Sequence, residues 1–291
     1  MKFSLDWLGD HVSVADAGGA DGARSLLDRA GLPVESAEEF GGDAVFDVEI
    51  TPNRPDAMGH RGLAREVAAM AAIPFRGDGA DTVGEIPTGG PAVEELTSVE
   101  VQVPRLCRRF GARVIRGTRS VPSADRVRSR LAAIGSKPID AAVDATNYAL
   151  WDSGQPLHAF DLDRLAGGRI VVRKAKRGEK LVTLDGIERE LEPSDVVVAD
   201  AERAVSLAGI MGGLDTAVTE RTTNVLLEAA WWDPVAIRRT SRRLGMHTDA
   251  SHRFERGADP EAIPNALDLA ARLLLGAAGG TLAPGWIDAR G

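Results

Sequence analysis

Cysteine and aromatic residues are scarce in this chain of 291 residues. Its single cysteine, Cys107, excludes a disulfide within the chain. The five histidines are scattered and no Cys/His spacing indicates structural zinc, so we expect neither a metal nor a cofactor. Aromatic residues make up only 4% of the chain and include one tyrosine, which argues against a nucleic-acid surface built on base stacking.

Long apolar runs are also missing. No stretch approaches the ~20 consecutive apolar residues that span a bilayer. The opening MKFSLDWLGDHV has acidic residues where a signal peptide would have an uninterrupted apolar segment. Together with the lone cysteine, these features predict a cytoplasmic protein with no membrane partner.

The net charge of −8 would repel a polyanion, so we expect no DNA partner, and any RNA contact needs a local basic surface. One candidate is a predicted helix in which Arg238 and Arg242 share a face, as do Arg239 and Arg243. A solvated, salt-bridged helix face explains the same pattern equally well. The sequence therefore predicts at most weak RNA binding, centred on these four arginines.

Hydrophobic periodicity predicts an α+β fold with a small N-terminal α+β domain over residues 1–76. Ser4 can cap a short helix, and a second helix is expected near Asp21–Ala30. Alternating apolar residues predict a strand at 44–51, which is followed by a turn and another helix. Residues 77–98 are rich in Gly, Pro and acidic residues without an apolar period, which is typical of a linker.

Residues 99–291 are expected to form a larger domain with a mixed sheet. Helices are predicted at 124–134, capped by Ser123, and at 260–278, after Asp259. Long loops between the elements favour an α+β arrangement over regular βαβ alternation. Strands are predicted at 110–116, 169–175, 195–199 and 224–229.

Three segments of the larger domain carry candidate chemistry. The stretch 208–213, AGIMGG, matches neither dinucleotide nor P-loop patterns, so it is either a tight turn or bare backbone beside a ligand. Glu228 lies in the apolar strand VLLEAAWW, where an unpaired carboxylate is costly; an ion pair with an arginine and a ligand contact both remain open. Neither His158 nor the pair Ser251 and His252 shows a defined nucleophile–base arrangement.

Several long segments of the chain closely resemble the bacterial phenylalanyl-tRNA synthetase β-subunit family, in the same order. They are EITPNRPDAMGHRGLAREVAA, KPIDAAVDATNYALWDSGQPLHAFDLDRL, LDG, AGIMGGLDTAVTERTTNVLLEAAWWDP and RRLGMHTDASHRFERGADP. The opening MKFSLDWLGDHV and RSLLDRAGLPVES resemble the N-terminal domain of that subunit. The resemblance implies a first domain of the B1 type followed by a B3/B4 editing domain.

The chain also departs from that family. The family inserts a tRNA-binding OB-fold domain where this chain has only Glu39–Asp43, and its β-subunits continue into further domains that are missing here. We therefore expect no aminoacyl-tRNA ligase activity from the chain alone, although a synthetase subunit remains a possible partner. The sequence leaves open whether the chain is a natural full-length protein or a fragment.

The resemblance implies a proofreading pocket that hydrolyses tyrosine wrongly esterified to the phenylalanine tRNA. The implied catalytic positions are His158, Asn147 and Gly212, and the implied substrate-binding positions are Glu228, Thr248, Ala250, Thr146 and Gly209. In this scheme Glu228 meets the phenolic hydroxyl, and Gly212 and Ala250 keep the ring slot open. Asn147 and backbone amides near Gly209 stabilise the oxyanion, while His158 orients water or the terminal ribose.

Tyrosine and phenylalanine differ by one hydroxyl, which an apolar pocket rejects by only ~100-fold, whereas a pocket built to bond it discriminates by ~10⁴–10⁵. An ionised Glu228 would offer only acceptors and would be left unsatisfied by phenylalanine. The sequence thus predicts a hydrolase of mischarged tRNA. The alternative is a non-catalytic module that binds an aromatic amino acid or a protein.

Overall fold

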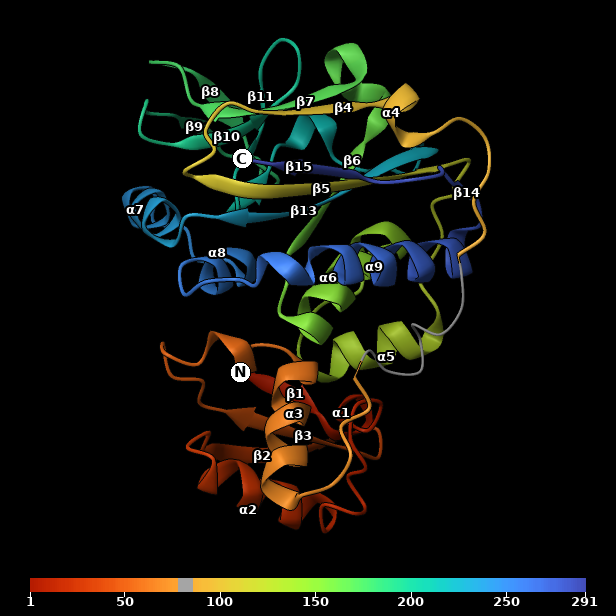
Figure 1. The fold of residues 1–291 in the computed structure, drawn as a ribbon, viewed down its shortest axis with the longest axis vertical. Coiled ribbons are helices and arrows are strands. Elements are labelled where there is room, and N and C mark those ends of the chain that lie inside the picture. The colour runs from red at the N-terminus through yellow and green to blue at the C-terminus, as the bar shows by residue number, and fades with distance from the viewer. Residues whose placement is uncertain (78–85) are drawn as a thin grey trace.

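The computed structural model describes residues 1–77 and 86–291, which form a small N-terminal domain below a larger one (Figure 1). The small domain has a three-stranded antiparallel sheet in the order β1-β3-β2, covered by helices. Its elements are β1 (Lys2–Ser4), α1 (Leu5–Leu8), α2 (Gly19–Arg29), β2 (Val34–Phe40), β3 (Asp43–Val48), η1 (Pro55–Ala57) and α3 (His60–Ala71).

Local signals explain several of these elements. The Ser4 hydroxyl accepts a hydrogen bond from the backbone N–H of Trp7 at 3.0 Å, so the predicted cap of α1 is confirmed. Gly41 and Gly42 join β2 to β3 with φ values of 60° and 89°, as a tight hairpin turn requires. The chain therefore closes the hairpin directly at the point where the resemblance implies a missing domain.

The larger domain stacks two sheets and a layer of helices. One sheet has the order β12-β11-β10-β7-β4, with only the β4–β7 pair parallel, and the other has the order β14-β5-β13-β6, with β15 also paired to β5. The strands are β4 (Ser98–Val101), β5 (Cys107–Arg116), β6 (Leu157–Asp161), β7 (Arg169–Lys174), β10 (Val196–Ala199), β11 (Ala204–Leu207), β12 (Met211–Gly212), β13 (Asn224–Trp232), β14 (Thr281–Leu282) and β15 (Ile287–Arg290).

Alternation along β13 divides the core of this domain. Leu226, Ala230 and Trp232 face the other sheet, whereas Leu227 and Trp231 face the helices. These helices cover the outer face of the β13 sheet (Figure 1). The helical elements are α4 (Val93–Leu96), α5 (Asp125–Ala133), α6 (Ala141–Ser153), α7 (Pro234–Leu244), α8 (Asp249–Phe254), α9 (Ile263–Ala278), η3 (Leu162–Arg164), η4 (Ala166–Gly168), η5 (Leu214–Thr216) and η6 (Pro260–Ala262); β8 (Lys180–Val182) and β9 (Glu188–Glu190) form a separate hairpin.

The α+β fold class is confirmed, with corrections to individual elements. The Ser123 hydroxyl does not cap α5: it donates to Asp144 Oδ2 at 2.5 Å, because the helix begins only at Asp125. The helix predicted at 260–278 starts as the 3-10 turn η6 and becomes α-helical at Ile263. Strand β2 was missed because all but its first residue is exposed, which leaves no apolar alternation.

The predicted linker at 77–98 is too long. Residues 78–85 lie outside the described residues, but α4 and the first residue of β4 fall within the predicted range. Val93 is fully buried in the core between the two sheets, and its N–H donates to Pro284 O at 3.0 Å. A four-residue helix is too short to show a helical period, so composition alone could not separate it from a linker.

The two domains are joined by a buried polar and aromatic interface at the end of α6. Asp152 accepts hydrogen bonds from Trp7 Nε1 and His11 Nε2, each at 2.8 Å. Burial opposes the charges of this pair, but their contact outweighs it, so the pKa of His11 is raised and the pKa of Asp152 is lowered. His60 Nδ1 pairs with Trp151 O at 2.8 Å, which makes the small domain part of the support of α6.

Across the described residues, no helix is both long enough and apolar enough to cross a bilayer.

We predict that Asp152→Ala lowers the free energy of unfolding by about 3–5 kcal/mol, because it removes one partner of a buried pair and leaves His11 Nε2 and Trp7 Nε1 without their acceptor. The matched control Asp215→Ala removes an exposed ion pair with Arg203 and should cost no more than about 1 kcal/mol. Urea denaturation of both variants measures the difference. Equal losses in the two variants would show that the Asp152 contacts do not hold the domains together.

Candidate ligand pocket between the two sheets

Seven of the eight predicted catalytic and substrate-binding residues meet at a cavity of about 250 Å³ in the larger domain. The cavity lies between the β13 sheet and the turn that follows β11. Residues of α6 and α8 line its other sides. Its volume is just below the ~300–1,000 Å³ of typical small-molecule pockets, so it suits a ligand of about one amino acid. The lining residues are Asn147, Leu150, Pro156, Leu157, His158, Leu184, Ser206, Leu207, Gly209, Ile210, Met211, Gly212, Glu228, Trp232, Thr248, Asp249, Ala250 and Phe254.

Glu228 occupies the centre of the pocket's sheet wall. It pairs in register with His158 on β6 and Ala112 on β5, and its side chain is 6% exposed. Its Oε2 atom is covered and has no hydrogen-bond partner, and no cation among the described residues forms an ion pair with it. Burial raises the pKa of Glu228 to about 8, so the carboxyl group is mainly protonated at pH 7. Because no described cation pairs with Glu228, the ion-pair hypothesis is wrong, and burial favours the protonated form over the ionised form expected from the sequence.

His158 lies beside Glu228 on the same face of the sheet, because the two residues are directly opposed on antiparallel strands. Its ring packs edge-on against Phe160 with centroids 4.4 Å apart, and its Nε2 atom is covered without a partner. Burial lowers the pKa of His158 to about 4, so the imidazole is neutral at pH 7. Two neutral, unpaired polar groups thus share one wall of the cavity.

Position 212 requires glycine because of the neighbouring His158 ring, not because of its backbone conformation. A Cβ atom at this position would lie 2.4 Å from Cε1 of His158, which no side chain tolerates without displacing the ring. Gly209 has φ of +65°, and a Cβ there would meet Trp232 at 2.7 Å. The stretch 208–213 is therefore both the predicted tight turn and a wall of the pocket.

Backbone amides in this turn are only partly free to serve a ligand. The N–H of Ile210 donates to Leu207 O at 3.0 Å, and the N–H of Gly213 donates to Val205 O at 2.8 Å. These two amides are used by the fold and cannot be oxyanion donors. Asn147, on α6, is the side-chain amide that lines the cavity.

Thr248 shapes the pocket through its own hydrogen bonds. It caps α8, where its hydroxyl accepts from Ser251 N at 3.0 Å and donates to Ile210 O at 2.9 Å. These bonds tie α8, which also carries Ala250, to the glycine turn. Thr146 is the exception among the predicted residues: it does not line the cavity, and its hydroxyl donates to Val143 O within α6 at 2.7 Å.

Ser251 and His252 do not form a hydrolase pair. The Ser251 hydroxyl accepts from Thr248 N at 2.9 Å as part of the α8 cap, while His252 Nδ1 contacts Arg256 at 2.9 Å. The apolar residues that line the cavity, including Leu150, Trp232 and Phe254, were not predicted from the sequence. No signal separates such residues from ordinary core positions, because both require the same side chains.

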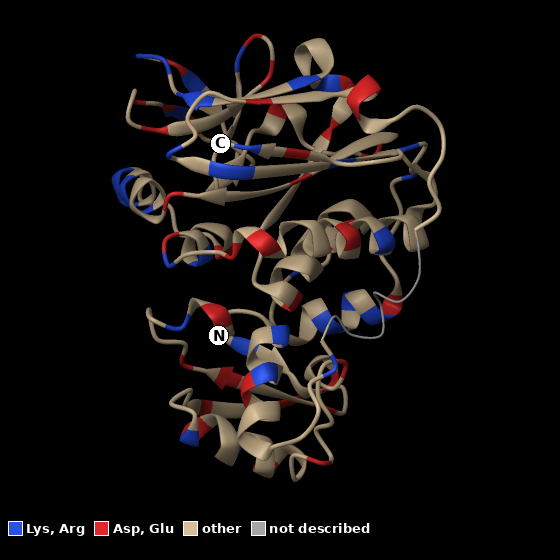
Figure 2. Cartoon of the chain, viewed as in Figure 1, with Lys and Arg blue, Asp and Glu red and all other residues tan. Residues whose placement is uncertain are grey.

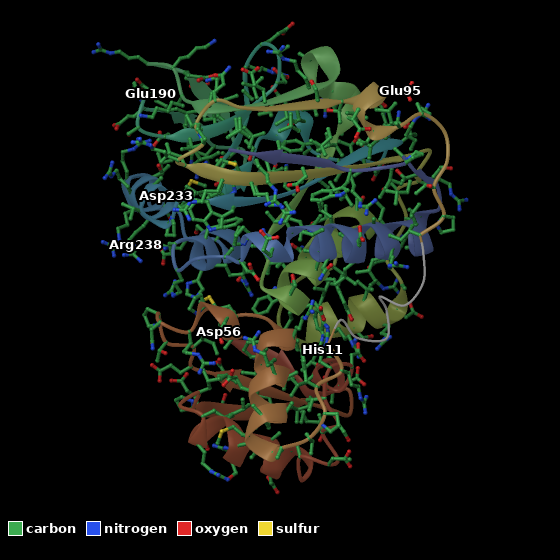
Figure 3. The ribbon with its side chains drawn as sticks, viewed as in Figure 1. His11, Asp56, Glu95, Glu190, Asp233 and Arg238 are labelled. Atoms are coloured by element: carbon green, nitrogen blue, oxygen red, sulfur yellow. The ribbon has the colours of Figure 1, made fainter. Side chains whose placement is uncertain are left out.

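The four predicted RNA-contacting arginines lie on α7 but are not equivalent (Figure 2). Arg243 forms an ion pair with buried Asp195, and Arg238, labelled in Figure 3, donates to Glu255 O at 3.0 Å. Arg239 and Arg242 are exposed and make no ion pair within the described part of the chain. Only these last two are free for a polyanion.

The fold and the pocket define a domain of one known class. The profile of the B3/4 domain family matches residues 106–279, more than half of the chain and all of the cavity's lining residues. The chain therefore belongs to the B3/4 domain family.

Its relatives extend the similarity to nearly the whole chain and confirm the resemblance found in the sequence. It is 47% identical to the phenylalanine–tRNA ligase beta subunit of Moorella thermoacetica, over 99% of this chain and 36% of that protein. The corresponding subunit of Anaeromyxobacter dehalogenans is 46% identical over 89% of this chain and 32% of its own length. The chain thus spans about a third of these relatives.

The chain also matches a solved N-terminal fragment of the phenylalanyl-tRNA synthetase beta subunit from Pyrococcus horikoshii. The match covers all of this chain and 79% of that fragment, with 14% identity and a TM-score of 0.44. That similarity is too low to support any further conclusion.

The raised pKa of Glu228 predicts a pH-dependent stability difference between the wild type and Glu228→Gln. A glutamate in the unfolded chain loses its proton near pH 4.5, whereas the folded protein holds it to about pH 8. Stability from this group is therefore complete below pH 4.5 and is lost as pH rises through 8. Urea denaturation at pH 5, 7 and 9 should show the free energy of unfolding of Glu228→Gln increasing relative to that of the wild type as pH rises. A constant difference between the two proteins at all three pH values would mean that Glu228 is ionised throughout.

Proposed function

We propose that this chain hydrolyses tyrosine from mischarged phenylalanine tRNA, and that the cavity at Glu228 is its proofreading pocket. One observation carries the proposal: a pocket of single amino-acid size contains a carboxyl group that has no partner among the described residues. A buried polar atom without a hydrogen bond costs about 1–3 kcal/mol. A ligand that brings its own hydroxyl to this wall removes that cost.

The carboxyl group of Glu228 would select the ligand. Even when protonated, its carbonyl oxygen accepts a hydrogen bond from a phenol. Phenylalanine fills the same slot but leaves that oxygen unsatisfied, so tyrosine is favoured. The similarity to phenylalanine–tRNA ligase beta subunits supports this choice, because the amino acid in their name differs from tyrosine by that hydroxyl alone.

Hydrolysis of the ester needs a placed water and a stabilised oxyanion. Water attacks the ester carbonyl carbon, the bond to the ribose oxygen breaks, and that oxygen takes up a proton as free tyrosine is formed. Asn147 supplies an amide donor for the oxyanion. His158, neutral because of its lowered pKa, is a weak base, so it orients water rather than removing a full proton.

Glu228→Ala tests this assignment through tyrosine and phenylalanine affinity. At pH 7 the variant should lose about 2- to 13-fold in tyrosine affinity, the range for a neutral hydrogen bond, with little change for phenylalanine. Above pH 8 the wild-type carboxyl ionises, its hydrogen bond strengthens, and the loss should grow to about 13- to 150-fold. Hydrolysis of Tyr-tRNA should fall in parallel.

Calorimetric titration with each amino acid at pH 7 and pH 9, together with melting temperatures, separates recognition from stability. A well-folded Glu228→Ala protein that keeps its tyrosine preference at both pH values would remove the basis of the proposal.

RNA binding should depend on the two unengaged arginines of α7. Replacing Arg239 and Arg242 by Ala should weaken tRNA binding and reduce the slope of log K against log salt by roughly 1.4–1.8, because two phosphate contacts are lost. The control replaces Arg238 and Arg243, which the fold already uses, and should lower the melting temperature with a smaller change in slope. Filter binding at several salt concentrations measures both; equal slopes in all proteins would make α7 an ordinary solvated face.

A further inference from the structure

The tip of the β8–β9 hairpin forms part of the pocket's rim. Leu184 lines the cavity and yet is 44% exposed, so its side chain reaches from the cavity to solvent. Its N–H donates to Gly212 O at 3.0 Å, which fixes the tip to the glycine turn. Ile187, three residues on in the same turn, is 54% exposed and does not line the cavity. The tip therefore continues the apolar wall of the pocket outward.

Polar contacts hold this tip in a defined shape. Asp185 accepts from the Thr183 hydroxyl at 2.7 Å and from Arg189 Nη2 at 2.8 Å. The N–H of Thr183 donates to Ile187 O at 3.1 Å across the turn. These three hydrogen bonds fix the shape of the turn, and within that shape the side chains of Leu184 and Ile187 are exposed to solvent.

Six large apolar side chains in the described chain are exposed to this extent, and three of them lie on the tip or directly after the glycine turn. Of the six, Leu184 and Ile187 are on the tip, and Leu214 follows the glycine turn. Single exposed apolar residues need no explanation, but a group beside a pocket indicates a contact surface.

Basic side chains flank the same edge of the sheet. Lys174 at the end of β7, and Lys176 and Arg177 in the turn that leads into β8, are exposed and make no ion pair with any described residue. Lys174 pairs in register with Val196, whose carbonyl accepts from the N–H of Ala208, the residue before the glycine turn. These cations therefore lie at the end of the sheet that carries the pocket, where Figure 2 shows blue segments interspersed with red ones.

We propose that the tip, with Leu184 and Ile187, is the seat of the terminal base of an RNA whose aminoacyl group occupies the pocket. The inference rests on the proposed function and extends it to the RNA part of the substrate. The cavity holds only about one amino acid, so the nucleotide that carries the ester must lie on the rim. The base packs on the aliphatic tip, and the preceding phosphates face the basic turn, whose charge is opposite to theirs.

The test measures binding, so that it is independent of catalysis. The probe is a short RNA ending in CCA that carries tyrosine through an amide in place of the ester, and free tyrosine is titrated alongside it. Ile187→Ala should weaken binding of the RNA probe by roughly three- to tenfold, since part of an aliphatic side chain leaves the contact. Free-tyrosine affinity should not change, because Ile187 does not line the cavity.

The matched control is Ile139→Ala, an isoleucine that is 68% exposed outside the pocket, and it should bind both ligands as the wild type does. If Ile187→Ala bound the RNA probe as tightly as the wild type, while the wild type preferred the probe to free tyrosine, the seat would be overturned and the pocket would stand. If the wild type bound neither ligand, both the seat and the proposed function would fall. Equal wild-type affinity for probe and tyrosine would also overturn the seat, and would leave the tip as a surface for a protein.

Discussion

The Glu228 carboxyl group lies between two β-sheets with no cation among the described residues beside it, and the architecture of the pocket depends on that burial. A core carboxyl group can avoid the cost of charge only by pairing with a cation or by keeping its proton. Here burial raises the pKa of Glu228 to about 8, which favours the second solution. The protein tolerates an unsatisfied polar group at a place where an apolar residue would pack better, which is typical of a site that a ligand completes.

The rest of the fold shields the Glu228 side chain from bulk solvent while leaving it on the wall of the cavity. Gly212 brings the β11–β12 turn onto the His158 ring, and Thr248 links α8 to the same turn. The small domain supports the opposite side: Trp7 and His11 hold Asp152 at the end of α6, the helix that presents Asn147 to the cavity. The N-terminal domain is therefore part of the pocket's support, although none of its residues lines the cavity.

Sequence patterns were sufficient where a residue's role depends on its immediate neighbours. The alternation in β3, the strand-like runs of β5 and β13 and the Ser4 cap are local signals, and they were predicted close to their observed positions. The catalytic and substrate-binding residues came from family resemblance, and the structure brings all of them except Thr146 to one cavity. The four arginines came from helical spacing and lie on α7. Thr146 was misplaced because it adjoins Asn147 in sequence, but the two point in different directions on a helix.

What failed depended on contacts between distant segments. Whether Glu228 is ionised depends on which side chains fold against it, and the many arginines of the chain made an ion pair a reasonable hypothesis. None of those arginines that the structure describes pairs with Glu228, and several are engaged elsewhere, as Arg243 is with Asp195 and Arg253 with the carbonyl of Met58. Helix α4 and strand β2 were missed for a related reason: each is stabilised by tertiary contacts that leave no periodic signal.

The central claim is that the pocket distinguishes an esterified tyrosine from an esterified phenylalanine by one hydroxyl. The most direct measurement compares the deacylation rates of Tyr-tRNA and Phe-tRNA, both made on the phenylalanine tRNA, with the purified chain at pH 7 and pH 9. We expect faster release of tyrosine than of phenylalanine at both pH values, and a larger ratio of the two rates at pH 9, where Glu228 is ionised. Equal rates for the two amino acids, or a ratio that does not change with pH, would contradict it.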